Sequence, residues 1–182
     1  MANITLAVTG SISAYKAADL TSQLTKLGHK VTVLMSRSAM DFITPLTLQS
    51  LSKNLVHTDV MVEEVPSLIK HIDIAKETDL FLVAPASANT IAKLAHGMAD
   101  NIVTATALAL PIGIPKLIAP AMNTNMYLNP ATQKNLNTLE EYGFDEVKPR
   151  EALLACGDFG TGALAEVTDI LEKVSNTLDE KK

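Results

Sequence analysis

The sequence predicts one α/β domain, an open parallel sheet of the Rossmann-like or flavodoxin-like kind with helices on both faces. Short apolar runs of strand length alternate with stretches of helical period, which is the order typical of parallel sheets. One run, Leu80 to Ala84, is unbroken, as expected for a strand buried on both faces. With 182 residues, 47% of them hydrophobic, the chain can bury a full core. We expect the domain to span residues 1–178 and residues 179–182 to form a solvated tail.

The composition excludes several classes of protein. The 15 Lys and Arg residues against 20 Asp and Glu residues give a net charge of -5, which provides no broad basic face for nucleic acid or anionic lipid. The single cysteine excludes an internal disulfide, and the opening residues do not form a leader, so we expect a cytoplasmic protein. The longest apolar stretch, Ile102 to Ile112, is too short to cross a bilayer. Only 19% of residues are charged, so part of the apolar surface is expected to meet another copy of the chain.

The first predicted unit is a strand over Ile4 to Thr9, a polar turn over 10–13 and a helix ended by Gly28. Backbone N–H groups and the hydroxyls of Thr9, Ser11 and Ser13 would surround a pocket that suits a phosphate monoester, although an ordinary βα turn is the alternative. A dinucleotide fits less well, because the G-x-G-x-x-G fingerprint is absent and the strand at 31–35 ends without an acidic residue. The helix is expected to bury one face, formed by Ala17, Leu20, Leu24 and Leu27.

The next stretch predicts short helical pieces over Ser38 to Leu55, with Pro45 in a first turn. Phe42 lies just past the second strand, beside the proposed pocket, where it is either a core residue or a cofactor contact. Residues 56–70 have no clear period and are interpreted as a variable connection. His71 opens a helical turn that leads into the central strand, and its position alone does not decide between a structural and a functional role.

Polar residues follow the central strand. Pro85 has no N–H to donate, so we expect the strand to stop there and the chain to leave over the carboxyl edge of the sheet. Ser87, Asn89 and Thr90 then open a helix, where they form either a helix cap or a ligand-binding turn.

The same layout recurs later in the chain. Lys116 to Ala119 is a predicted strand, and the loop at 120–127 again reads Pro-Ala followed by small polar residues, so two loops bearing Asn are expected to meet in one crevice. Between the two loops, Gly97 ends one helix and Asp100 or Asn101 caps the next.

The last third of the chain predicts a helix, a strand, a flap and a final helix. Asn129 and Pro130 begin a helix that runs to Tyr142, and residues 144–147 form the last strand. Residues 153–162 contain three glycines within six residues and the thiol of Cys156, which indicates a mobile flap. The final helix carries its apolar stripe on Val167, Ile170, Leu171, Val174 and Leu178.

Four of these segments together resemble the flavin-containing cysteine decarboxylases over almost the whole chain. Gly-Ser-Ile-Ser at 10–13 is similar to the family's FMN phosphate loop, and Pro-Ala-Ser-Ala-Asn-Thr at 85–90 to its flavin-contacting loop. Pro-Ala-Met-Asn-Thr-Asn-Met at 120–126 matches its substrate motif, and Leu-Ala-Cys-Gly at 154–157 its substrate flap. The sequence departs from the family at Ala163-Leu164, where many bacterial relatives have Arg-Met, and at Tyr127, which replaces a frequent Trp.

The resemblance implies FMN as cofactor, phosphopantothenoylcysteine as substrate, phosphopantetheine as product, a homotrimer and no metal. It implies that His71 acts in oxidation as a base or orienting group, that Asn123 holds the substrate carboxylate and that Cys156 donates a proton during reduction. The expected FMN contacts are Gly10, Ser11, Ser13, Ser36, Phe42, Ser87, Ala88, Asn89, Thr90 and Ala121. The expected substrate contacts are Asn123, Met122, Met126, Ala155 and Gly157.

Three alternatives share parts of this pattern. A peptidyl-cysteine decarboxylase would use the same flavin, histidine and amide on a different substrate. A flavin prenyltransferase is disfavoured by Asn123 and Cys156, and a non-enzymatic regulatory relative is disfavoured because no long acidic extension is present. Arg37 and Arg150 are the only arginines, and they either hold the substrate phosphate or lie on the surface. The ligase domain of bifunctional relatives is expected on another polypeptide.

Overall fold

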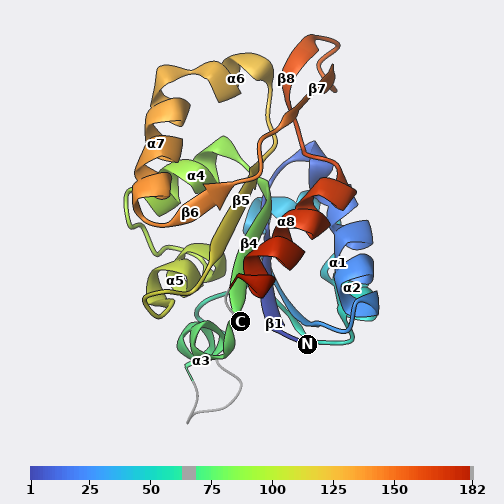
Figure 1. The fold of residues 1–182 in the computed structure, drawn as a ribbon, viewed down its shortest axis with the longest axis vertical. Helices are drawn as coiled ribbons and strands as arrows, with labels where there is room; N and C mark the ends of the chain where they lie inside the picture. Colours follow the sequence, from blue (N-terminus) through green and yellow to red (C-terminus); the bar gives the residue numbers. More distant parts are fainter. Residues whose placement is uncertain (63–68, 181–182) are drawn as a thin grey trace.

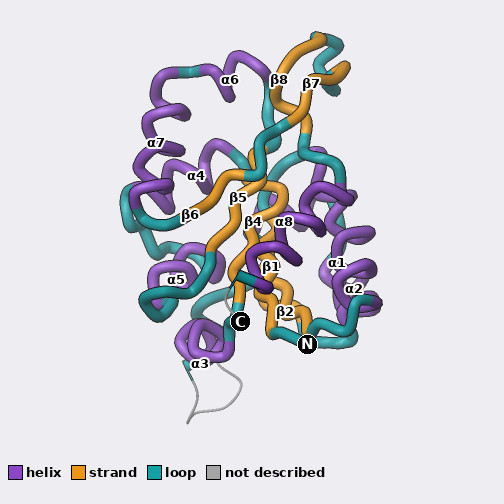
Figure 2. The backbone as a smooth tube through the Cα atoms, viewed as in Figure 1, coloured by secondary structure: helices purple, strands orange, loops and turns teal. Residues whose placement is uncertain are grey.

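A computed structural model describes residues 1–62 and 69–180, and within them the predicted α/β fold is confirmed. Parallel strands form one open six-stranded sheet in the order β3-β2-β1-β4-β5-β6 (Figures 1 and 2). The order reverses between β1 and β4, the position at which open α/β sheets bind ligands. The strands are β1 (Asn3–Val8), β2 (Lys30–Met35), β3 (Val56–His57), β4 (Leu80–Ala86), β5 (Lys116–Pro120) and β6 (Phe144–Glu146).

Helices cover both faces of the sheet. Buried side chains of α1, α2 and α8 pack on one face, and those of α4, α5 and α7 pack on the other (Figure 1). The apolar stripe expected on the final helix is confirmed, because all five of its residues pack in the first of these cores. The helices are η1 (Ile12–Tyr15), α1 (Lys16–Lys26), η2 (Arg37–Asp41), α2 (Pro45–Ser52), α3 (Lys70–Glu77), α4 (Ala88–Ala95), α5 (Ile102–Ala109), α6 (Thr124–Leu128), α7 (Pro130–Glu141) and α8 (Val167–Asp179).

Strand β4 is central, as predicted, and all of its residues are buried. Its side chains alternate between the two cores, with Leu80 and Leu82 in one and Phe81 and Val83 in the other. The expectation that the strand stops at Pro85 is wrong by one residue. Its pairing with β5 shifts between 83 and 86, and this irregularity accommodates a proline that has no N–H to donate.

The segment predicted as a mobile flap forms most of a β-hairpin, and its mobility stays a prediction. Strands β7 (Arg150–Leu153) and β8 (Phe159–Ala163) pair antiparallel in a separate two-stranded sheet. This hairpin stands beyond the carboxyl ends of the main strands, at the top of Figure 1. The three glycines therefore belong to a hairpin, where they allow a tight tip and close packing.

Four smaller expectations need correction. Leu27 is 61% exposed, because α1 ends at Lys26 and Gly28, at φ +85°, turns the chain out of helical phase. The connection at 56–70 contains strand β3 and the start of α3, while its residues 63–68 lie outside the described part. The loop at 120–127 contains the start of α6, which Asn123 caps. Helix α8 includes Asp179, the first residue of the predicted tail, and residues 181–182 are not described.

Within the described part of the chain, no helix combines the length and hydropathy needed to cross a membrane. The apolar stretch that begins at Ile102 is instead α5, whose first residues are buried in the core. Asn101 caps this helix by accepting hydrogen bonds from the N–H groups of Val103 and Thr104, at 3.0 and 3.2 Å.

Candidate active site

A cavity of about 490 Å³ lies where the sheet order reverses, outside the carboxyl ends of β1 and β4. Segments that are far apart in the sequence line it: the 10–16 turn, Phe42, the start of α4, residues 121–126 and the β7–β8 hairpin. Its volume is within the usual range for a small-molecule or cofactor site. The fold therefore brings the predicted phosphate loop, polar turn and hairpin to one place.

The 10–13 turn is shaped by close packing. A Cβ atom on Gly10 would lie 2.6 Å from Oγ of Ser38, so only glycine lets the turn pack against the start of η2. Ser11 then caps η1 by accepting a hydrogen bond from the N–H of Ser13 at 3.3 Å. Both serines line the cavity, which gives it hydroxyl groups beside a helix start.

Thr9 joins the two loops of the reversal point instead of lining the cavity. Its side chain is fully buried, and its hydroxyl donates to the carbonyl of Pro85 at 2.7 Å. The N–H of Ser87 donates back to the same hydroxyl at 2.8 Å. The expectation that the Thr9 hydroxyl faces the pocket is therefore wrong, because both of these bonds fix it between β1 and the start of α4.

The thiol and the amide singled out in the sequence are in contact. Nδ2 of Asn123 donates a hydrogen bond to Sγ of Cys156 at 3.3 Å, although the two residues are 33 positions apart. Asn123 is held by capping α6, because its Oδ1 accepts from the N–H of Asn125 at 2.9 Å. The amide Nδ2 is thereby left to face the cavity and the hairpin.

Two glycines hold the hairpin against the 122–124 segment. The N–H of Met122 donates to the carbonyl of Gly162 at 2.9 Å, and a Cβ on Gly162 would lie 2.2 Å from the carbonyl oxygen of Met122. A Cβ on Gly160 would lie 2.6 Å from Oγ1 of Thr124. Larger residues at either position would move the hairpin, and with it Cys156, away from Asn123.

Most of the predicted site residues line this one cavity. They are Gly10, Ser11, Ser13, Phe42, Ser87, Ala88, Ala121, Met122, Asn123, Met126, Ala155 and Cys156.

Four predicted contacts do not line it, for local reasons. Ser36 caps η2, accepting from the N–H of Ala39 at 3.3 Å, and is buried. Thr90 is buried beside the Ser87 cap, which donates to its hydroxyl at 3.2 Å. Asn89 follows Ala88 by about 100° around α4 and is exposed, so both loops reach the crevice but only the second brings its Asn side chain into it. Gly157 lies exposed at the hairpin tip.

His71 lies at the other edge of the sheet. It is on α3, which feeds the amino end of β4, whereas the cavity is outside the carboxyl end of that strand (Figure 1). A seven-residue strand spans roughly 20 Å. Within one chain, His71 therefore cannot touch a molecule bound beside Cys156.

The model of the family described as "Flavoprotein" matches residues 1–179. The chain belongs to the flavoprotein family.

Individual relatives narrow the resemblance. This flavoprotein is 60% identical, over 96% of its length and 98% of the relative, to a probable phosphopantothenoylcysteine decarboxylase of Streptococcus mutans. It is 47% identical to the coenzyme A biosynthesis bifunctional protein CoaBC of Bacillus subtilis, over 93% of the chain but only 41% of that protein. The resemblance to the cysteine decarboxylases is thus confirmed at the level of the family.

Solved structures agree with this assignment. A PPC decarboxylase mutant complexed with pantothenoylaminoethenethiol superposes with a TM-score of 0.88 at 31% identity, covering 98% of each chain. The FMN binding protein AtHal3 gives a TM-score of 0.85, also at 31% identity, over 98% of this chain and 97% of its own.

The flavoprotein's cavity also contains two charged residues, of which Arg150 was considered from the sequence as a possible phosphate ligand and Lys16 was not. Lys16 and Arg150 both line it, and both pair with the carboxylate of Glu166, at 3.4 and 2.9 Å. Arg37 instead is on the surface beside Asp41. Lys16 lies three positions after Ser13 and begins α1, and this closeness to the serine turn was the one signal in the sequence that could have indicated it.

A buried pair supports the short helix α6. The hydroxyl of Tyr127 donates to Oε1 of Glu146 on β6 at 2.9 Å, and Gln133 donates to the carbonyl of Tyr127 at 2.7 Å. Burial, followed by the hydrogen bond to Glu146, raises the pKa of Tyr127 to about 12. Burial likewise raises the pKa of Glu146. Tyrosine at this position therefore ties α6 to the sheet.

The raised pKa of Tyr127 predicts a loss of stability at high pH. The folded protein holds the phenol proton more tightly than the unfolded chain, whose tyrosine pKa is 10.0. The stabilisation is therefore complete below pH 10 and disappears as the pH rises toward 12. We expect the free energy of unfolding, measured with denaturant, to fall over this pH range more in the wild type than in Tyr127→Phe. Equal pH dependence of the two proteins would contradict this assignment.

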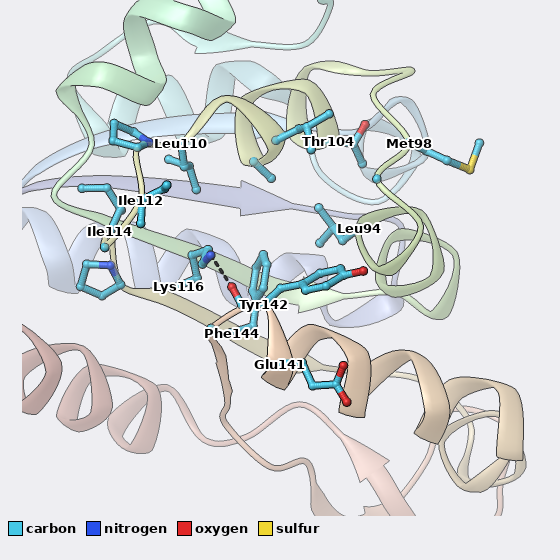
Figure 3. Close-up of a pocket in the computed structure, with 17 residues that line it drawn as sticks. Leu94, Met98, Thr104, Leu110, Ile112, Ile114, Lys116, Glu141, Tyr142 and Phe144 are labelled. Atoms are coloured by element: carbon cyan, nitrogen blue, oxygen red, sulfur yellow. Dashed lines mark hydrogen bonds between the residues drawn. The ribbon is translucent and has the colours of Figure 1, made fainter.

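A second cavity, of about 630 Å³, lies at the opposite edge of the sheet between the ends of α4, α5 and α7 (Figure 3). Nζ of Lys116 donates to the carbonyl of Tyr142 at 2.5 Å and lies 5.2 Å from the ring centre of Phe144. Burial lowers the pKa of Lys116. None of the predicted site residues lines this cavity, so the candidate active site is the cavity that contains Cys156.

Proposed function

We propose that this flavoprotein uses FMN to decarboxylate phosphopantothenoylcysteine to phosphopantetheine in coenzyme A biosynthesis. The observation that carries the proposal is the contact between Asn123 and Cys156 in the cavity at the reversal of the sheet. An amide beside a thiol offers a carboxylate ligand and a proton donor within one small volume. The names of the relatives support the same substrate and pathway.

The residues of the cavity fit FMN. Gly10 permits the tight turn, and the hydroxyls of Ser11 and Ser13 lie at the start of a helix, as a terminal phosphate requires. Phe42, Ala121 and Met122 supply apolar surface for a planar ring system. We assign the phosphate to the serine turn and the ring to the surface between Phe42 and the start of α4.

The reaction needs an electron sink, because loss of carbon dioxide from a cysteine carboxylate leaves a carbanion that an unmodified thiol side chain cannot delocalise. Bound in this cavity, FMN would supply reversible two-electron redox chemistry, by which the CH2–SH group is oxidised to a thioaldehyde and is reduced again after carbon dioxide has left. Asn123 holds the carboxylate through its amide N–H, and His71 acts as a base or orienting group during oxidation. Cys156 gives its proton to the carbon that lost carbon dioxide. The net reaction is redox-neutral.

His71 enters this scheme from a second copy of the chain. It lies at the amino-end edge of its own sheet, away from the cavity. Its Nδ1 is buried without a hydrogen-bond partner among residues 1–62 and 69–180. A homotrimer in which α3 of one copy meets the cavity of the next would bring His71 to the substrate. The low share of charged residues supports such an interface.

The test is to incubate the purified protein with phosphopantothenoylcysteine and, separately, with a peptide ending in cysteine. We expect phosphopantetheine from the first and no mass loss from the second. Decarboxylation of the peptide alone would assign the chain to the peptidyl-cysteine decarboxylases. No conversion of either substrate by protein that contains flavin would favour a non-enzymatic role.

Replacing Gly162 with alanine should impair this activity strongly. The new Cβ would collide with the carbonyl of Met122, and displacement of the hairpin should lower turnover on the order of 100-fold. The matched control is Gly113→Ala, because Gly113 also has positive φ but has open space around its Cβ, at the other edge of the sheet. Unchanged turnover in Gly162→Ala would show that the hairpin contact is not needed.

A further inference from the structure

Cys156 has a second hydrogen-bond partner, which no motif in the sequence singled out. Its Sγ donates to Oδ2 of Asp158 at 3.4 Å, while it accepts from Nδ2 of Asn123 at 3.3 Å. The sulfur is thus flanked by a donor from the substrate motif and an acceptor from its own turn.

The tip of the hairpin produces this contact. The N–H of Gly157 donates to the carbonyl of Leu154 at 2.9 Å, and the N–H of Leu154 donates to the carbonyl of Asp158 at 2.8 Å. Gly157 has φ +91°, which a residue with a side chain rarely adopts, and this turn brings the carboxylate back to the thiol two positions earlier. The Cys-Gly-Asp order therefore has a structural reason.

The other charges in the cavity do not replace this carboxylate. Lys16 and Arg150 line the cavity, and both pair with Glu166, so their charges are partly compensated. Glu151, on the same hairpin, accepts a hydrogen bond from Thr161 at 3.3 Å. Among the described residues, Asp158 is the carboxylate hydrogen-bonded to Sγ of Cys156.

We infer that Asp158 is a positioning residue that keeps Cys156 protonated and orients its S–H group for proton transfer; this rests on the proposed function. An anion beside the sulfur opposes a second negative charge there. In the transfer, the S–H bond breaks, its electron pair stays on sulfur and a C–H bond forms on the substrate. The thiolate then regains a proton from water, and Asp158 favours that return.

The test is the rate at which iodoacetamide alkylates Cys156 at pH 7, because only the thiolate reacts and the chain has no other cysteine. We expect Asp158→Asn to react about fivefold faster than the wild type, the factor for two unit charges about 4 Å apart in water. The matched control Glu151→Gln removes the same charge from the same hairpin and should react at the wild-type rate. Asp158→Glu, which keeps the charge, should stay closer to the wild type than Asp158→Asn does.

Equal alkylation rates in the wild type and Asp158→Asn would overturn the inference, as would an equal acceleration in Glu151→Gln. Alkylation needs no substrate, so this result is independent of whether the proposed reaction is correct. In turnover measured at rising pH, the yield of saturated product should begin to fall at a lower pH in Asp158→Asn than in the wild type. A purely structural role would lower the yield equally at every pH.

Discussion

A Cys156→Ser variant is expected to release carbon dioxide from phosphopantothenoylcysteine and then stop at the enethiol. The sulfur lies in the cavity beside Asn123, and in the proposed reaction it protonates the substrate carbon after the carboxylate has left. A serine hydroxyl keeps the shape but is a much weaker acid, so oxidation and decarboxylation proceed while reduction fails. We expect the yield of phosphopantetheine to fall by at least about 100-fold.

The measurement is mass spectrometry of the product together with quantified carbon dioxide. The expected result is one equivalent of carbon dioxide per bound flavin, without saturated product. A normal yield of phosphopantetheine would remove Cys156 from the reductive step, and absence of carbon dioxide would place the cysteine earlier in the reaction.

A His71→Asn variant is expected to keep its flavin and lose turnover. The side chain is at the opposite edge of the sheet from the cavity of its own chain, so its replacement leaves the phosphate loop and the hairpin intact. Loss of a general base typically costs 10²- to 10⁴-fold, and we expect a loss of about that size. Full activity of this variant would leave His71 with a structural role only.

Mixing two inactive variants tests whether His71 acts across copies. If His71 of one copy serves Cys156 of the next, mixed oligomers of His71→Asn and Cys156→Ser contain some sites in which both residues are native. Random mixing should restore up to about one quarter of wild-type phosphopantetheine formation. If both residues acted within one chain, every site would remain defective and no recovery would occur.

The parallel sheet, its central strand and the edge at which the cavity lies could be predicted because they follow from local patterns. The buried run at Leu80–Ala84 marks the centre of the sheet, and the small polar residues after it mark the carboxyl edge. For Ser87 the helix-cap interpretation is confirmed, since it caps α4 through the N–H of Thr90; it also lines the cavity, and the ligand-binding interpretation stays a prediction. A capping side chain at a reversal point can serve both purposes.

Contacts that depend on distant packing could not be predicted in the same way. The glycines at 160 and 162 suggested mobility, which stays a prediction, but the sequence did not show that they let a hairpin approach residues 122–124. Asn89 follows the pattern of a site residue but faces outward, because helical phase and not sequence proximity decides its direction. His71 is adjacent to the central strand in sequence, but it precedes the strand and so lies at the far edge.

Reconstitution with flavin shows whether bound FMN must accept electrons from the substrate before carbon dioxide can leave. The protein is stripped of flavin, divided into samples with no flavin, riboflavin or FMN, and given phosphopantothenoylcysteine. We expect the purified protein to be yellow, FMN alone to restore phosphopantetheine formation, and riboflavin, which lacks the phosphate, to restore little. A colourless protein with no affinity for FMN, or equal activity without flavin, would contradict this role of FMN.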